Sequence, residues 1–167
     1  MPSSGWTLKS THCPRGESVE RMSVPMEQNQ VGIPSRPTRI LVVDDERYIA
    51  RFLVYVLTEE GYEAQAVYDG EEALHAATTY APDAILLDLL LPKISGQEVL
   101  TRLRADPRFA GLKILLLTGC PVQEGDSREP LSSSADAYCL KPIGPSVLIG
   151  LLRKLGLPSQ VARESIA

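Results

Sequence analysis

The 167-residue sequence has little of what a membrane protein or a nucleic-acid-binding protein needs. No stretch approaches the roughly 18 consecutive apolar residues of a membrane-spanning helix, and the N-terminal region lacks the apolar core of a secretory signal peptide. Lys and Arg number 17 against 21 Asp and Glu, for a formal net charge of −4. Because nonspecific binding to nucleic acid or anionic membrane requires a basic surface, we expect neither as a direct partner.

Cysteine is also scarce, and the three cysteines do not form a metal-binding motif. Cys13, Cys120 and Cys139 lack metal-ligand spacing, and three cysteines cannot all pair with one another. Cys139 falls in an apolar segment and Cys13 in a polar one. The simplest setting for such cysteines is the reducing cytoplasm.

The composition changes near residue 38. Residues 1–37 are rich in Pro, Gly and Ser and show neither helical nor strand periodicity, which is typical of a disordered extension. Residues 38–157 are long enough for one domain with a single core, and 158–167 would form a short C-terminal tail.

Within this domain the pattern alternates between strands and helices. Strands are predicted at 39–43, 63–67, 84–88, 113–118 and 138–140, and helices at 46–60, 70–80, 97–105 and 146–155. The first helix would bury an apolar face made of Ile49, Phe52, Leu53, Val56 and Leu57. Gly61 is expected to end the first helix as a C-cap, and Asp69 to cap the start of the second helix. Pro145 is well placed at the start of the last helix. Alternating βα units of this length predict an α/β fold with a doubly wound, five-stranded parallel sheet of strand order 2-1-3-4-5.

One segment departs from this pattern. Residues 121–134 occupy the place of a fourth helix, but Gly125, Pro130 and three serines give the segment poor helix propensity and almost no apolar face. We therefore expect an atypical fourth helix.

Four of the predicted strands end in a residue that could hold or accept a phosphate. The first ends at Asp44-Asp45, the third at Asp88, the fourth at Thr118 and the fifth at Lys141. Sites in open α/β sheets lie beyond the carboxyl ends of the strands. Each feature alone has an ordinary explanation: an Asp pair can cap a helix, Asp88 can belong to a turn, and Thr118-Gly119 can be a strand end. All four at one edge of one sheet indicate a site.

The segments that carry these residues resemble the receiver domain of bacterial two-component response regulators. They are ILVVDDE (40–46), AILLDLLLPKISG (84–96), ILLLTG (114–119) and ADAYCLKP (135–142), in the family's order. The resemblance covers about residues 38–157 and implies a flavodoxin-like fold.

The resemblance also implies roles for individual residues. Asp88 would accept a phosphoryl group from a histidine kinase or phosphotransfer protein. Lys141 would pair with Asp88 and then with the phosphoryl group, and Thr118 would offer a hydroxyl donor. Mg²⁺ would bind to Asp45 and Asp88, to Asp44 through water, and to the carbonyl of Leu90. The amides of Leu90 and Gly119 would hold phosphoryl oxygens, and Lys141 would precede a cis peptide at Pro142. Tyr138 would turn inward when Thr118 moves toward the phosphate.

The function expected from this resemblance is that of a stand-alone phosphoacceptor with no enzymatic activity beyond its own phosphorylation and dephosphorylation. It would signal by binding a downstream protein whose identity the sequence does not name, and it could form a homodimer. Two alternatives remain. One is a receiver-like interaction module without phosphorylation, for which the complete Asp, Thr and Lys set is unnecessary. The other is a phosphatase of the haloacid-dehalogenase type, which would need an Asp at the position of Leu90.

Overall fold

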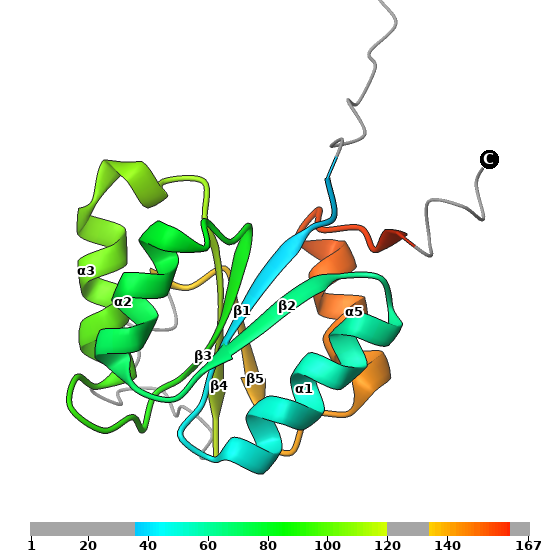
Figure 1. Cartoon of the computed structure of the whole chain (residues 1–167), viewed down its shortest axis with the longest axis horizontal. Coiled ribbons are helices and arrows are strands. Elements are labelled where there is room, and N and C mark those ends of the chain that lie inside the picture. The colour runs from blue at the N-terminus through cyan, green and yellow to red at the C-terminus, as the bar shows by residue number, and fades with distance from the viewer. Residues whose placement is uncertain (1–35, 120–133, 161–167) are drawn as a thin grey trace, which may run out of the picture. The chain divides into compact units, whose positions relative to one another are not determined.

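The computed structural model describes residues 36–119 and 134–160, which form an α/β fold around one parallel sheet (Figure 1). The strand order is β2-β1-β3-β4-β5, and every neighbouring pair is parallel. The strands are β1 (Arg39–Val43), β2 (Glu63–Val67), β3 (Ala84–Asp88), β4 (Lys113–Thr118) and β5 (Ala137–Leu140). The predicted fold class, strand positions and strand order are therefore confirmed.

Helices cover both faces of the sheet. The helices are α1 (Arg47–Glu59), α2 (Gly70–Thr79), α3 (Gly96–Ala105) and α5 (Pro145–Lys154), with a short 3₁₀ helix η1 (Pro107–Phe109) that the sequence did not predict. Figure 1 shows α2 and α3 on one side of the sheet and α1 and α5 on the other. Residues 1–35 of the predicted extension, residues 120–133 of the atypical segment and residues 161–167 of the tail lie outside the described part of the chain. Within the described ranges, no helix combines the length and apolarity that crossing a membrane requires.

The core has two layers because both faces of the sheet are buried. Successive strand residues point to opposite faces, so each central strand must be apolar throughout, which explains the uninterrupted apolar runs in the sequence. Full burial of one Leu or Ile side chain stabilises the fold by roughly 1.5–3 kcal/mol. The residues that face α2 and α3 include Leu41, Val43, Ile85, Leu87 and Leu116, and those that face α1 and α5 include Ile40, Val42, Leu86, Leu115 and Leu117.

The prediction of the buried apolar face of α1 is wrong for one residue, Phe52. Leu53 and Leu57 are buried as expected, together with Ala50, but the side chain of Phe52 is 49% exposed. Phe52 lies at the margin of the buried stripe, where it lines a groove that Pro142 and Ile143 also border. Helical periodicity predicts which side of a helix is apolar, but it does not show how far the neighbouring elements extend over that side.

The end of α1 and the start of α2 use the predicted capping residues. Gly61 adopts a φ of 80°, and the amides of Gly61 and Tyr62 donate to the carbonyls of Thr58 (2.9 Å) and Leu57 (3.0 Å), which closes the helix. The side chain of Asp69 accepts a hydrogen bond at 2.8 Å from an amide in the first turn of α2. The cap at Gly61 fixes where the chain enters β2, and the cap at Asp69 fixes where it leaves the carboxyl end of β2.

The residues after α5 return to the sheet at the edge opposite the strands' carboxyl ends. Thr38 donates its hydroxyl to the carbonyl of Pro158 at 3.1 Å, and Tyr62 donates its hydroxyl to the carbonyl of Leu157 at 2.8 Å. Ser159 is fully buried. The packed part of the chain therefore extends at least two residues beyond Leu157.

Candidate functional site

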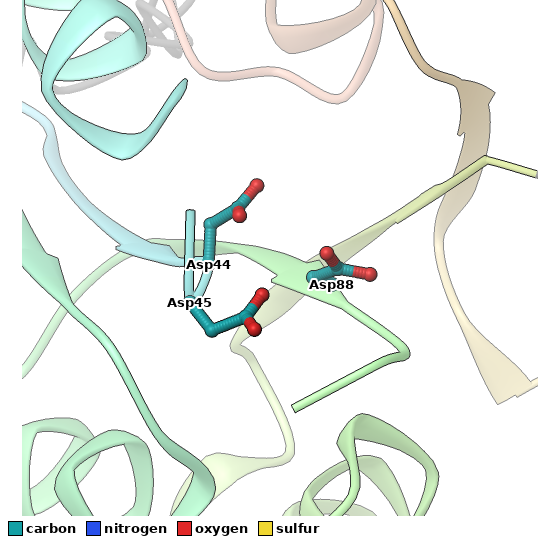
Figure 2. A group of neighbouring side chains, drawn as sticks. All are labelled: Asp44, Asp45 and Asp88. Atoms are coloured by element: carbon teal, nitrogen blue, oxygen red, sulfur yellow. The ribbon is translucent and has the colours of Figure 1, made fainter. Parts of the chain in front are cut away.

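Three aspartates meet at the carboxyl ends of β1 and β3. Asp44 and Asp45 follow the last residue of β1, and Asp88 is the last residue of the neighbouring strand β3. Figure 2 shows the three side chains beside one another where these strands end, and one oxygen from each carboxylate lies within 4.8 Å of the others. We call this group of three carboxylates the acid pocket. The sequence predicted this meeting from the parallel order of the strands.

Among the residues that the structure describes, one cation reaches into the acid pocket, from the end of β5. The ammonium nitrogen of Lys141 lies 2.5 Å from Asp88 Oδ2 and 2.6 Å from Asp44 Oδ2. The contact with Asp88 was predicted, but the contact with Asp44 was not. Since Asp44 and Asp88 stand on adjacent strands, a side chain that reaches one of them is also close to the other.

The three carboxylates differ in their exposure to solvent. Asp44 is fully buried and Asp88 is 6% exposed, whereas Asp45 is exposed. Burial raises the pKa of Asp44 above its ordinary value, and Lys141 opposes that shift only in part. Burial acts to lower the pKa of Lys141, but the carboxylates of Asp44 and Asp88 outweigh it, so this pKa is raised. Lys141 is therefore protonated at neutral pH, and it lies beside the buried carboxyl of Asp44, which loses its proton at a higher pH than an ordinary Asp.

Backbone hydrogen bonds hold two of the carboxylates in place. Asp44 Oδ1 accepts from the amide of Glu46, and Asp88 Oδ1 accepts from the amide of Leu90, both at 3.0 Å. Asp44 Oδ2 has no donor in good hydrogen-bond geometry among the described residues, and its close neighbour is the Lys141 ammonium. The ion pair with Lys141 therefore neutralises this buried oxygen.

The chemistry of the donor set fits magnesium. Mg²⁺ prefers hard oxygen ligands, is bound in proteins by one or two carboxylates, and keeps several of its waters. The acid pocket offers carboxylate oxygens from three residues, and the exposed Asp45 leaves room for water on one side. The residues present therefore suit a partly hydrated Mg²⁺ ion.

The other predicted site residues lie at the same edge of the sheet. Thr118 ends β4, is 5% exposed, and accepts at its carbonyl a 2.8 Å hydrogen bond from the amide of Lys141. Gly119 follows and lines the groove beside α1, where Lys141 also lies. Leu90 is 80% exposed in the loop after Asp88. The peptide bond between Lys141 and Pro142 is cis, as the family resemblance implied.

Tyr138 is half-buried and packs against the core layer on the side of α2 and α3. In the register of β4 with β5, Tyr138 is opposite Leu116, and Thr118 is opposite Leu140. Because side chains two residues apart on a strand share a face, Thr118 and Tyr138 belong to the same face of the sheet. The structure thus places the two predicted switch residues on neighbouring strands and on one side.

With this geometry in view, comparison with known proteins decides the family. The model of the response regulator receiver domain matches residues 40–153, which is more than half of the chain. The chain belongs to the response regulator receiver domain family. Receiver domains are in general phosphoacceptors rather than conventional enzymes, they work with histidine kinases, and they bind Mg²⁺ at an acidic pocket.

Individual relatives support this membership. The chain is 41% identical over 115 residues to the DNA-binding response regulator MtrA of Mycobacterium tuberculosis, covering 69% of this chain and 49% of MtrA. It is 39% identical over 127 residues to the transcriptional regulatory protein PhoP of Bacillus subtilis, covering 76% of this chain and 52% of PhoP. A solved CheY-like receiver domain from Methylobacillus flagellatus is 30% identical with a TM-score of 0.64, covering 72% of this chain and 99% of that one. This chain spans about half the length of the curated relatives it matches.

Proposed function

We propose that this receiver domain accepts a phosphoryl group on Asp88 in a reaction that requires Mg²⁺. The observation that carries the proposal is the meeting of Asp88 with two further carboxylates and one lysine at the carboxyl edge of the sheet. A phosphoacceptor needs a carboxylate nucleophile, a divalent cation to neutralise the transferring group, and donors for its oxygens. The acid pocket and its neighbours supply residues for each need.

In this proposal an oxygen of Asp88 attacks the phosphorus of the donor. A P–O bond forms while the P–N bond to the donor's phosphohistidine breaks, and the released nitrogen keeps the electron pair. Asp88 Oδ2 is held by Lys141 and Oδ1 by the amide of Leu90, so one of these contacts must pass to the phosphoryl group. Lys141 and that amide would then stabilise phosphoryl oxygens, as would the hydroxyl of Thr118 and the amide of Gly119.

The metal ligands follow the same proposal. Asp45, which is exposed, and Asp88 would bind Mg²⁺ directly together with the carbonyl of Leu90, and Asp44 would bind through water. When bound, Mg²⁺ neutralises charge on the carboxylates and on the transferring phosphoryl group. The protein's contribution is to hold the ligands in place and to keep Lys141 protonated beside them.

The response to phosphorylation would pass through Thr118 and Tyr138. If the Thr118 hydroxyl moves toward the phosphoryl group, space opens on its face of the sheet, and Tyr138 stands on the same face one strand away. A downstream protein would then recognise the change in the surface around β5 that the movement of Tyr138 produces. The switch thus couples chemistry at the acid pocket to the surface around β5.

Several expectations about the whole protein stay predictions. These are the histidine kinase or phosphotransfer protein as donor, the downstream protein target, a homodimer, a cytoplasmic location, autocatalytic dephosphorylation and action without an attached output domain. The expected absence of direct nucleic-acid binding is also unconfirmed, since MtrA is described as DNA-binding and this chain matches about half of it.

The proposal is tested by incubating the protein with acetyl phosphate and Mg²⁺ and measuring intact mass. The wild type should gain one phosphate that survives acid and is lost in base, and chelation of Mg²⁺ should prevent the gain. Asp88→Asn should gain none, while Asp83→Asn, which removes an aspartate remote from the pocket, should behave as wild type. Equal labelling of Asp88→Asn would overturn the assignment.

A further inference from the structure

The loop that joins β3 to α3, residues 89–95, is held unusually close to its neighbours. An added Cβ at Gly96 would collide with the carbonyl oxygen of Asp88 and with Leu89, and one at Gly70, the first residue of α2, would collide with Ile94. Both collisions involve backbone atoms, which cannot move aside cheaply. The loop is therefore pressed against the start of α2 at one end and against the start of α3 at the other (Figure 1).

One residue of this loop has an uncommon backbone conformation. Lys93 has a φ of 63°, in the left-handed region that favours glycine. A lysine there is strained unless its surroundings hold it. The side chain of Lys93 supplies such a hold, because its ammonium lies 2.6 Å from Asp69 Oδ2 and 3.4 Å from Glu71 Oε2.

The partner of Lys93 is itself well anchored. The Asp69 side chain is only 10% exposed, and its other oxygen accepts the capping hydrogen bond at the start of α2. The capping hydrogen bond is the main cause that lowers the pKa of Asp69, and the hydrogen bond from Lys93 is the second. Asp69 in turn raises the pKa of Lys93. Both partners are therefore charged at neutral pH. The ion pair ties the loop to a fixed point of the helix rather than to a mobile side chain.

We propose that Lys93 is a positioning residue for the acid pocket: its ion pair with Asp69 holds the loop in the conformation that presents Leu90 to Asp88. The inference rests on the proposed function in one respect, namely that Leu90 contributes backbone groups to the metal and the phosphoryl group. The contact itself is present in the structure, since the amide of Leu90 donates to Asp88 Oδ1 at 3.0 Å.

Simple electrostatics and a positioning role predict opposite changes in Mg²⁺ affinity for Lys93→Ala. Lys93→Ala removes a positive charge, so the field alone would tighten Mg²⁺ binding. If Lys93 positions the loop, the same substitution should weaken Mg²⁺ binding by about two- to fivefold, the range expected for one exposed ion pair. Asp69→Asn keeps an N-cap acceptor, removes the partner charge and should weaken binding by a similar factor. Lys93→Arg should restore wild-type affinity.

Two measurements on the full chain test this proposal. Calorimetric titration with Mg²⁺ gives the affinity, and amide exchange at Leu90 in metal-free protein, followed by NMR, reports the loop without any metal. Exchange at Leu90 should be about two- to fivefold faster in Lys93→Ala and Asp69→Asn than in wild type, and Glu71→Gln should show little change, since that partner is farther away.

The outcomes separate the two proposals. Unchanged exchange at Leu90 in Lys93→Ala overturns the positioning role, as does faster exchange combined with unchanged or tighter Mg²⁺ binding. A wild type that binds no Mg²⁺ defeats the proposed function instead, and Leu90 exchange then still decides whether Lys93 holds the loop.

Discussion

The ammonium of Lys141 lies 2.5 Å from Asp88 Oδ2, although the two residues are 53 positions apart in the sequence. The parallel sheet makes this contact possible, because β3 and β5 flank β4 and all three end at the same edge. The same ammonium also contacts the buried Asp44. One lysine therefore balances two carboxylates that would otherwise repel each other in a poorly solvated space.

Removing Lys141 should strongly destabilise the metal-free protein. Lys141→Met removes the cation that pairs with Asp44 and Asp88, and breaking a buried pair in this way typically lowers the free energy of unfolding by about 3–5 kcal/mol. Chemical denaturation at pH 7 in the presence of a chelator measures the loss. Lys113→Met is the control: its ion pair with Asp136 is more exposed, so the loss should be at most about 1 kcal/mol. Equal losses would show that the buried lysine contributes no more than a surface one.

The buried Asp44 should make metal-free stability fall as pH rises. Its pKa is raised in the folded protein, so between the ordinary value of 3.8 and the raised value the folded state binds more protons than the unfolded state. The free energy of unfolding must then decrease with pH through that window. Without Mg²⁺, Asp44→Asn should be more stable than wild type at pH 7, and the difference should shrink toward pH 3.8. Denaturation curves across this pH range measure the difference.

Asp136 gives a control of opposite sign. Burial acts to raise its pKa, but hydrogen bonds from the Ile114 amide and Lys113, together with Arg104, outweigh burial and lower it. Its stabilising contribution is present above 3.8 and is lost as pH falls through the lowered value. Asp136→Asn should thus be less stable than wild type at pH 7. If Asp44→Asn and Asp136→Asn change stability in the same direction at pH 7, burial does not raise the pKa of Asp44.

Mg²⁺ should stabilise the folded protein by mass action. At free Mg²⁺ ten times the dissociation constant, the free energy of unfolding should rise by about 1.4 kcal/mol, since the ligands are assembled only in the folded state. Thermal melts with and without Mg²⁺ measure this gain. Asp45→Asn should remove most of it while folding normally, because Asp45 is exposed. A melting temperature that does not respond to millimolar Mg²⁺ would count against the metal site.

The close approach of the β3–α3 loop predicts an asymmetry between two glycines. Gly96→Ala should lower the free energy of unfolding by about 1–3 kcal/mol, because its Cβ would collide with the backbone of Asp88 and Leu89. Gly150→Ala in α5 meets nothing within 4 Å and should raise stability by about 0.5–1 kcal/mol through higher helix propensity. Denaturant midpoints compare the two. A neutral Gly96→Ala would mean that the loop can move away from α3.

The sequence was sufficient to predict the sheet and the membership of the acid pocket. Continuous apolar runs identify strands buried on both faces, and the doubly wound order brings the ends of β1, β3, β4 and β5 to one edge. Asp44, Asp45, Asp88 and Lys141 meet there as predicted. Residue patterns are informative here because strand burial follows from local periodicity, and the alternation of strands and helices indicates a doubly wound sheet.

What depends on three-dimensional packing was not predicted. Which of two adjacent aspartates is buried depends on how β1 turns into α1, and Phe52 proved exposed because no described element covers it. The strain at Lys93 and its contact with Asp69 join segments whose separate patterns give no sign of the pairing. Such contacts between distant loops leave no periodic signal in the sequence.

The most direct test of the central claim is to locate the phosphoryl group on the chain. Borohydride reduces an aspartyl phosphate to homoserine, so protein treated with acetyl phosphate and Mg²⁺, reduced and digested can be mapped by peptide mass spectrometry. Homoserine at position 88 in the complete reaction, and none when Mg²⁺ is chelated, is the expected result. Homoserine at position 44 or 45, or a phosphate retained on a serine, threonine or histidine, would contradict the assignment of Asp88.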